Sequence, residues 1–307
     1  MKIVFAGTPE FAVPAFEEIV KLFDVVAVLT QPDKPQGRKR ILTPSPIKQA
    51  ALAHDIPVLQ PVKLREDMGE LLSFGADLMV TCAYGQILSR ETLDAFPMGV
   101  WNIHAGLLPA YRGAAPIAAA IAAREKETGV TVMRTDIGVD TGDIFLCSKL
   151  PIEENDTCGS LSLKLSKLGA KLICTALERI ERGDVVLQKQ GEGRVCRKVE
   201  RTMIDFSKRA DEVSALIRSL SPAPLAYAQM GERVINCYQA SVADVESEEK
   251  PGTILEISPK KGLIVACGDG AVRISELQPA GGKRMADTAF ANGKSINKGE
   301  CFDKPVL

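Results

Sequence analysis

Short apolar runs alternate with helix-like segments through the first half of the chain. Apolar residues recur at helical spacing between the runs, as from Phe11 to Val20. Runs that are apolar on both faces and alternate with helices are typical of strands in a parallel sheet. The pattern predicts an α/β fold with a Rossmann-like, open and mostly parallel sheet, whose sites lie at the carboxyl ends of the strands. The first four predicted strands are Lys2–Ala6, Val25–Thr30, Leu78–Cys82 and Val100–His104.

The pattern changes in the second half. Strand-like runs begin at Gly129 and Ile144, and a helix with an apolar face is predicted from Leu161 to Arg182. A polar and basic stretch follows, and beyond it one helix precedes short strands separated by turn signals, which indicates a small OB-like β-barrel. The predicted domains are an α/β domain at 1–187, a basic linker at 188–206 and a C-terminal β-barrel domain at 207–307.

Composition narrows the classes of function. The net charge of -1 argues against a globally basic nucleic-acid binder, so any polyanion site must be local. The eight cysteines form no C-x-x-C pair and no cluster with metal-ligand spacing, so we expect buried thiols and no metal. No apolar stretch approaches the ~18–20 residues that span a bilayer. The first apolar run stops at Gly7, too early for a signal peptide, so we expect a cytoplasmic protein without membrane contact.

Candidate chemistry gathers around one of only two histidines. In WNIHAGLLPAYRGAAPI, strand alternation points Asn102 and His104 to the same face at the end of a predicted strand. In TDIGVDTGD, Asp140 lies among glycines between two apolar runs. An amide donor, an imidazole and a carboxylate suit acyl transfer between nitrogens. The alternative is a structural Asn and His in a turn; the second histidine, His54, is predicted at the end of a helix.

Two ordered motifs carry a resemblance. NIHAGLLPAYRGAAPI together with GVTVMRTDIGVDTGDIF resembles the signature of 10-formyltetrahydrofolate-dependent formyltransferases. FAGTPEFAVPAF, TQPDKPQGRKR, LTPSPIK and AYGQIL point to the branch that formylates methionyl initiator tRNA for translation initiation, and the resemblance covers nearly the whole chain.

The resemblance implies roles for particular residues. Asn102 and protonated His104 would stabilise the oxyanion, and Asp140 would hold His104 and help to relay a proton. The donor would be 10-formyltetrahydrofolate, with no metal required. Departures from the family pattern occur at Gly106 and Ala110, where a Ser and a basic residue are usual. The turn implied in folate binding comprises Gly106, Leu107, Leu108 and Pro109.

Binding of tRNA is implied at two basic segments. Charge alone would leave the segment from Gln31 to Lys48 as a solvated loop, whereas the resemblance makes it the insertion that meets the acceptor arm. Rival interpretations are a formyltransferase for a small amine, such as glycinamide ribonucleotide or an amino sugar nucleotide, and a tRNA-binding protein without catalysis. We expect a monomer. The implied tRNA contacts are Lys34, Arg38, Lys39, Arg40, Arg197 and Lys198.

Overall fold

The computed structural model describes residues 1–37, 40–293 and 295–305. Contacts divide the chain into two compact units. The first unit changes to the second after Cys196, inside the stretch predicted as a linker. The three-part domain assignment stays a prediction. The first unit comprises Met1–Gly113, Thr128–Leu150 and Ser162–Cys196, and the second comprises Ala114–Glu127, Pro151–Leu161 and Arg197–Leu307.

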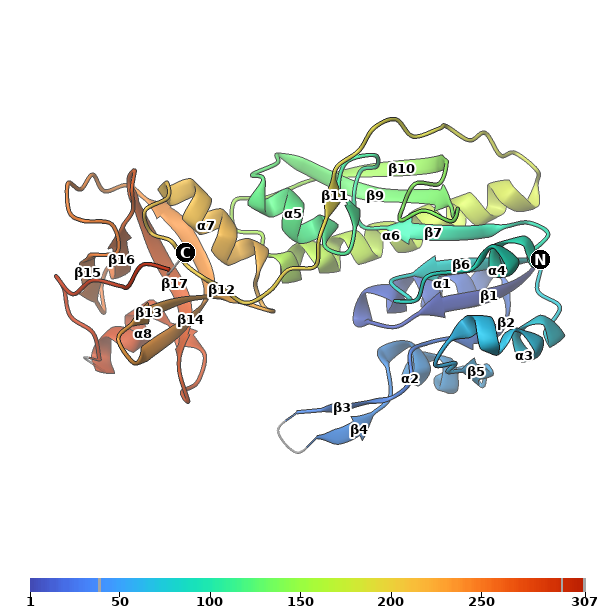
Figure 1. The fold of residues 1–307 in the computed structure, drawn as a ribbon, viewed down its shortest axis with the longest axis horizontal. Coiled ribbons are helices and arrows are strands. Elements are labelled where there is room, and N and C mark those ends of the chain that lie inside the picture. Colours follow the sequence, from blue (N-terminus) through green and yellow to red (C-terminus); the bar gives the residue numbers. More distant parts are fainter. Residues whose placement is uncertain (38–39, 294, 306–307) are drawn as a thin grey trace. The chain divides into compact units, whose positions relative to one another are not determined.

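The first unit is built on a seven-stranded sheet with the order β10-β9-β7-β6-β1-β2-β5 (Figure 1). The pairs β5–β2, β2–β1, β1–β6 and β6–β7 are parallel, and β9 is antiparallel to β7. The predicted mostly parallel α/β sheet is thereby confirmed. Its strands are β1 (Lys2–Gly7), β2 (Asp24–Leu29), β5 (Val58–Leu59), β6 (Leu78–Cys82), β7 (Val100–His104), β9 (Glu127–Arg134) and β10 (Ile144–Pro151).

Helices alternate with these strands, as the apolar spacing predicts. Ser45 accepts a hydrogen bond from the Lys48 backbone, and Pro46 occupies the first turn, so α2 begins with two favourable end signals. The predicted end of this helix at His54 is confirmed. The helical elements are η1 (Glu10–Ala12), α1 (Val13–Leu22), α2 (Pro46–Ala53), η2 (Leu64–Glu66), α3 (Met68–Ser73), α4 (Arg90–Asp94) and α6 (Cys158–Glu181), of which α6 starts in the second unit.

The core of the first unit surrounds β1. Residues Ile3 to Ala6 are fully buried, and the ring of Phe5 lies 5.4 Å from that of Phe16 on α1. Burial on both faces explains why β1 is apolar at every position from Ile3 to Ala6 rather than alternating. This strand lies inside the sheet between β2 and β6, and β7 follows β6 on the side of the candidate chemistry.

The second unit is a β-rich domain, as predicted. Its strand pairings run as one path, β12-β13-β14-β17-β16-β15, with ends at β12 and β15, and β18 pairs with β17. The segment with α5, predicted as part of the catalytic domain, groups with this unit, where α5 contacts α7. Its elements are α5 (Pro116–Ala122), β12 (Thr202–Met203), α7 (Ala210–Ser219), β13 (Ala226–Met230), β14 (Arg233–Ala243), β15 (Ile254–Ser258), β16 (Gly262–Ala266), β17 (Ala271–Pro279), β18 (Met285–Ala286), α8 (Asp287–Phe290) and η3 (Ala291–Gly293).

An ion pair with a buried carboxylate links α8 to β16 and β17 in this second unit. The carboxylate of Asp287 accepts hydrogen bonds from the Arg273 guanidinium at 2.8 Å and from the Leu263 backbone at 3.2 Å.

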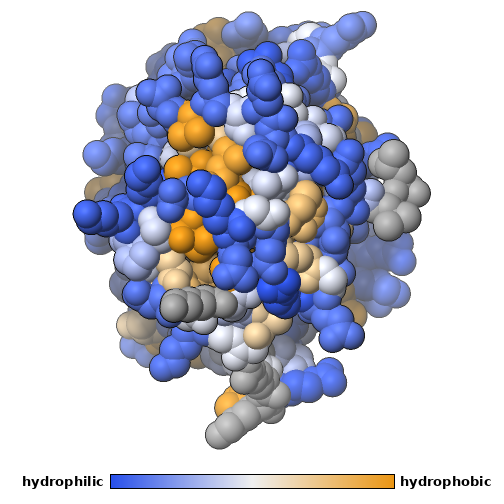
Figure 2. Space-filling model, turned by 90° about the vertical axis from the view of Figure 1, so that its left-hand side faces the viewer, coloured by the Kyte–Doolittle hydropathy of each residue, from blue (hydrophilic) through white to orange (hydrophobic). Residues whose placement is uncertain are grey.

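The face drawn in Figure 2 shows apolar residues near its centre, within hydrophilic surroundings. Within the described part of the chain, the helices are too short or too polar for any of them to cross a membrane.

Candidate active site

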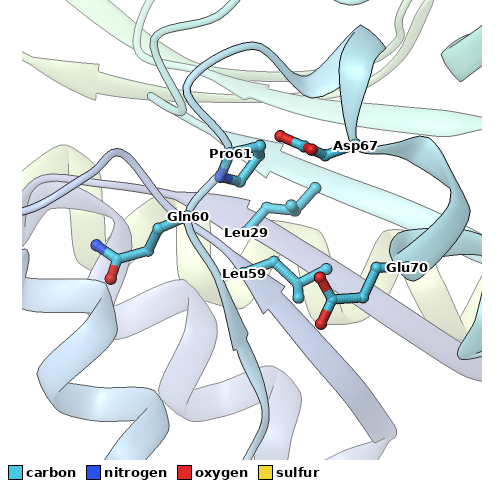
Figure 3. Close-up of a pocket in the computed structure, with 6 residues that line it drawn as sticks. All are labelled: Leu29, Leu59, Gln60, Pro61, Asp67 and Glu70. Atoms are coloured by element: carbon cyan, nitrogen blue, oxygen red, sulfur yellow. The ribbon is translucent and has the colours of Figure 1, made fainter.

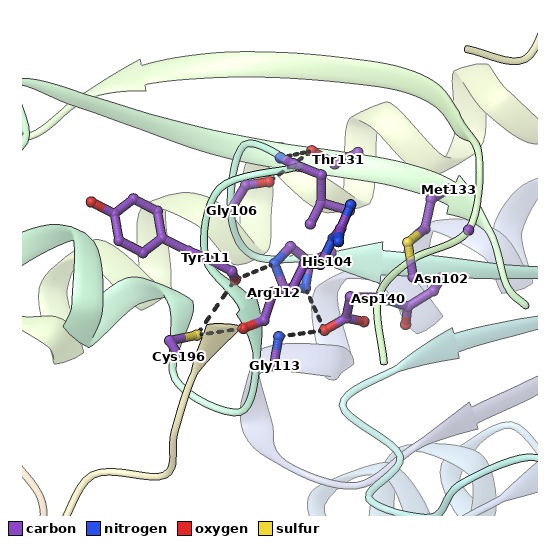
Figure 4. A network of polar contacts seen from close by, with 12 residues as sticks. Asn102, His104, Gly106, Tyr111, Arg112, Gly113, Thr131, Met133, Asp140 and Cys196 are labelled. Carbon is purple, nitrogen blue, oxygen red and sulfur yellow. Dashed lines mark hydrogen bonds and ion pairs between the residues drawn. The ribbon is translucent and has the colours of Figure 1, made fainter. Parts of the chain in front are cut away.

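The carboxyl end of β7 brings the predicted catalytic side chains together (Figure 4). Asn102 and His104 stand on the same face of this strand, and Asp140 comes from the loop between β9 and β10. The Nδ1 atom of His104 lies 3.5 Å from Oδ2 of Asp140. The imidazole is 5% exposed, so this pair meets largely away from solvent.

The surroundings of His104 decide its charge. Burial lowers its pKa below the usual value, while the Asp140 carboxylate and the Tyr111 carbonyl act in the opposite direction. Nε2 donates to that carbonyl at 3.0 Å, so the proton of the neutral ring resides on Nε2. Burial thus favours the neutral imidazole, whereas the sequence-based mechanism uses a protonated one.

Asp140 is held in an uncommon backbone conformation. Its φ is 52°, in the left-handed region that Asp tolerates better than most residues. The Gly113 backbone N–H donates to Oδ2 at 2.7 Å, which fixes the carboxylate against the turn that follows β7. Gly142 is required nearby, because a Cβ at this position would collide with the carbonyl of Arg134. The loop thus holds one carboxylate beside His104.

Asn102 is oriented by the neighbouring strand. Thr81 of β6 is its register partner, and the Thr81 hydroxyl donates to Oδ1 of Asn102 at 2.8 Å. This contact assigns the amide so that its NH₂ group remains available to a bound acceptor. Motif reasoning missed Thr81; the signal that could have found it is its position at the end of the adjacent parallel strand.

The predicted folate turn is fastened by a buried hydroxyl. Thr131 of β9 is fully buried and lies opposite His104 in the strand register. Its Oγ1 donates to the Gly106 carbonyl at 2.7 Å and accepts from the Leu108 N–H at 3.2 Å. These two hydrogen bonds hold the backbone of the turn at Gly106 and Leu108. Gly106 itself has no side chain that could do so. Thr131 was also missed, although it stands inside the motif GVTV.

The stretch predicted as a basic linker begins as part of this site. We call residues 188–196 the strap. Its first residue, Gln188, forms a bridge with Ile144, and its last two form β11 (Val195–Cys196), which pairs in parallel with β8 (Arg112–Gly113). The strap therefore runs along the turn that follows β7 and belongs to the first unit.

The predicted tRNA contacts that the structure describes occupy exposed positions. Lys34 lies on β3 (Lys34–Gln36) and Arg40 just before β4 (Ile41–Thr43), two strands that form a hairpin. Lys48 pairs with Asp33 at 2.8 Å and so is engaged at the base of this hairpin. Arg38 and Lys39 lie outside the described residues. Arg197 and Lys198 are exposed and belong to the second unit.

A separate pocket of about 230 Å³ lies beyond the ends of β2 and β5 (Figure 3). Its lining contains none of the predicted site residues, and its acidic members, Asp67 and Glu70, are exposed. The described residues contain no cluster of His, Cys, Asp and Glu that could hold a metal ion.

Comparisons with known proteins cover nearly the whole chain. The formyl transferase family model matches residues 1–177, and the model of the formyl transferase C-terminal domain matches residues 197–295. Methionyl-tRNA formyltransferase of Marinobacter nauticus is 44% identical over 95% of this chain and 96% of its own length. The enzyme of the same name from Symbiobacterium thermophilum is 43% identical over 99% of this chain and 96% of its own.

Solved structures of lower identity share the fold. An N-formyltransferase from Helicobacter canadensis, in complex with folinic acid and dTDP-3-aminofucose, aligns with a TM-score of 0.66 at 20% identity, over 89% of this chain and 98% of its own. HypX from Aquifex aeolicus with tetrahydrofolic acid aligns with a TM-score of 0.65 at 17% identity, over 99% of this chain and 51% of its own. Through its full-length relatives and both family models, the chain belongs to the methionyl-tRNA formyltransferases, within the folate-dependent formyltransferase family.

Proposed function

We propose that this protein transfers the formyl group of 10-formyltetrahydrofolate to the α-amine of methionine on initiator tRNA, giving N-formylmethionyl-tRNA. The observation that carries the proposal is the convergence of Asn102, His104 and Asp140 at the end of β7, in a chain of this family. The free amine is itself the nucleophile, so the reaction needs no Ser or Cys intermediate.

Asn102 supports the charge that develops on the formyl oxygen. Attack of the amine on the formyl carbon produces a tetrahedral intermediate with an oxyanion. Thr81 holds the Asn102 amide with its oxygen turned away from that role, so the NH₂ group donates to the oxyanion. A preoriented donor is most effective where charge forms only in the transition state.

The His104–Asp140 pair accepts the proton that the amine loses. Because Nε2 already donates to Tyr111, Nδ1 is the ring atom that accepts a proton, with Asp140 beside it. The imidazolium that forms is stabilised by an acceptor at each ring nitrogen. Breakdown of the intermediate breaks the bond between the formyl carbon and N10 of the folate, and the imidazolium gives its proton to the departing N10.

Substrate binding is assigned to two further regions. The turn from Gly106 to Pro109 holds the folate through its backbone, because the usual Ser hydroxyl is absent at Gly106. Lys34 and Arg40, together with Arg38 and Lys39, contact tRNA phosphates near the acceptor arm, and Arg197 and Lys198 supply a second contact. The enzyme acts as a monomer.

An acceptor competition tests the proposal. Labelled 10-formyltetrahydrofolate is offered with methionyl initiator tRNA, with glycinamide ribonucleotide and with an amino sugar nucleotide, using wild-type protein and the His104→Ala variant. Transfer only to the tRNA, and only by the wild type, supports the proposal. Faster transfer to a small amine would replace it with the rival formyltransferase function, and tRNA binding without transfer would indicate a non-catalytic binder. Sedimentation of the same sample checks the monomer.

A further inference from the structure

Gln190, the third residue of the strap, uses both ends of its side-chain amide. Its Nε2 donates to the carbonyls of Asp140, at 3.0 Å, and Gly142. Its Oε1 accepts from Nε of Arg112 at 3.0 Å and from Nη2 at 2.8 Å. One half-buried side chain thus connects the Asp140 loop to the turn that follows β7.

The Asp140 loop needs such a connection. A non-glycine residue with positive φ persists only where its surroundings fix it. Of the contacts described above, the one from Gly113 holds the carboxylate, and those from Gln190 hold the backbone on both sides of Thr141. The Arg112 guanidinium also donates to the Gly191 carbonyl at 2.8 Å, so the end of Gln190 that faces the turn is itself anchored.

We propose that Gln190 is a positioning residue, which fixes the Asp140 loop so that the carboxylate faces Nδ1 of His104. The proposal deepens the proposed function, on which its kinetic part rests. It gives the strap a role in the chemistry, although neither family model includes residues 178–196.

The other groups around His104 make this role measurable. Among the described residues, Asp140 is the charged side chain that meets the ring. Tyr111 contributes its carbonyl, which also accepts a hydrogen bond from the thiol of Cys196 at 3.4 Å. Displacing Asp140 removes the negative partner and leaves the Tyr111 carbonyl alone to oppose burial, so the pKa of His104 falls further.

The first test is a proton NMR titration of the full chain, in which the only histidines are His54 and His104. Gln190→Met removes all five printed hydrogen bonds of the side chain, including a long one from Nε2 to Sδ of Met133 at 3.9 Å, at similar side-chain volume. The matched control is Gln188→Met, since Gln188 is exposed and has no side-chain hydrogen bond among the described residues. We expect the His104 midpoint to move to lower pH in Gln190→Met alone, with the His54 curve unaltered. Asp140→Asn provides the reference for complete loss of the charge.

The second test measures kcat and KM for formyl transfer. Gln190→Met should lower kcat by about 10-fold to 10²-fold, the cost of a displacement of about 1 Å, with little change in the KM for folate. Gln190→Asn, which keeps the amide but shortens its reach, should shift both readouts less; it serves as the test if the Met variant does not fold. An unmoved His104 midpoint, with or without a lower Tm, overturns the proposal. A shifted midpoint in a chain that does not formylate tRNA keeps Gln190 as the positioning residue and rejects the proposed function.

Discussion

The end of β7 is buried and closely held by hydrogen bonds, whereas the β3–β4 hairpin is exposed to solvent. His104 is 5% exposed and each of its ring nitrogens faces an acceptor, whereas Ile41 and Leu42 of the hairpin are 62% and 63% exposed. The hairpin is fastened at its base, where Lys48 meets Asp33 and Gln60. Chemistry requires side chains held at fixed positions, and recognition of a large polyanion requires charges that reach into solvent. The two regions should therefore respond differently to substitution.

Removing the trio should give the largest effect. We expect His104→Ala and Asn102→Ala each to lower kcat by about 10²–10⁴-fold with the fold intact, because each removes an interaction that is strongest in the transition state. Single-turnover formyl transfer measures the loss, and circular dichroism checks the fold. Substitution of the other histidine, His54→Ala, is the control. Near-normal turnover in either trio variant would show that the end of β7 is not the catalytic site.

Removing the hairpin charges should act on binding instead. We expect replacement of Lys34, Arg38, Lys39 and Arg40 by Ala to raise the KM for tRNA and leave the KM for folate unchanged. Each lost phosphate contact reduces the slope of log affinity against log salt by roughly 0.7–0.9, so four contacts reduce it by about 3. KM measured over a series of salt concentrations provides the slope.

Lys171→Ala, which removes an exposed charge on α6, is the matched control for this variant. Equal slopes in the quadruple variant and the control would make the hairpin a solvated loop. Such a result would favour a small-amine acceptor.

The two regions also differ in how far the sequence predicts them. Alternation along β7 places Asn102 and His104 on one face, and the motif predicts Asp140, because these signals are local. Thr81, Thr131 and Gln190 have no such signal: their contacts join strands and loops separated by 21, 25 and 50 residues.

The local hydrophobic pattern likewise predicts the strands of the sheet. It does not predict which of the two units a segment belongs to. The strands of the first unit follow from their apolar runs, but α5 groups with the second unit and the strap with the first. Both assignments depend on tertiary contacts, to which composition is insensitive. The polar and basic composition of residues 188–196 therefore indicates a linker. Their backbone pairing with β8 and with Ile144 instead places the segment beside the candidate active site.

Loosening the turn predicted to bind folate should have an effect of intermediate size. Thr131→Val keeps the volume but leaves the Gly106 carbonyl and the Leu108 N–H without their buried partner, at a cost of about 1–3 kcal/mol. We expect the KM for 10-formyltetrahydrofolate to rise by roughly 10-fold while the KM for tRNA stays unchanged.

Thr131→Ser, which retains the hydroxyl, should recover most of the folate affinity. A Val variant with wild-type KM for folate, or an equal rise for both substrates, would contradict a specific hold on the turn. That result would reduce Thr131 to a packing residue.

The smallest effect concerns stability against pH. Burial lowers the pKa of His104 in the folded protein below about 6.5, the unfolded value, so between these values the unfolded chain binds more protons. The resulting stabilisation is present above the unfolded value and is lost as the pH falls through the folded one. Each kcal/mol lost lowers Tm by roughly 2–4 °C. We therefore expect wild-type Tm to fall more steeply from pH 7 to pH 5 than that of His104→Gln, which has no proton to gain.

Differential scanning calorimetry of the wild type, His104→Gln and His54→Gln separates this contribution from the titration of all other groups, which the three proteins share. His54 lies at the exposed end of α2 beside Glu17, and His54→Gln serves as the control for the loss of one histidine. Parallel curves for the wild type and His104→Gln would mean that His104 takes up its proton as readily in the folded protein as in the unfolded chain. The neutral resting imidazole, and with it the assignment of Nδ1 as proton acceptor, would then be wrong.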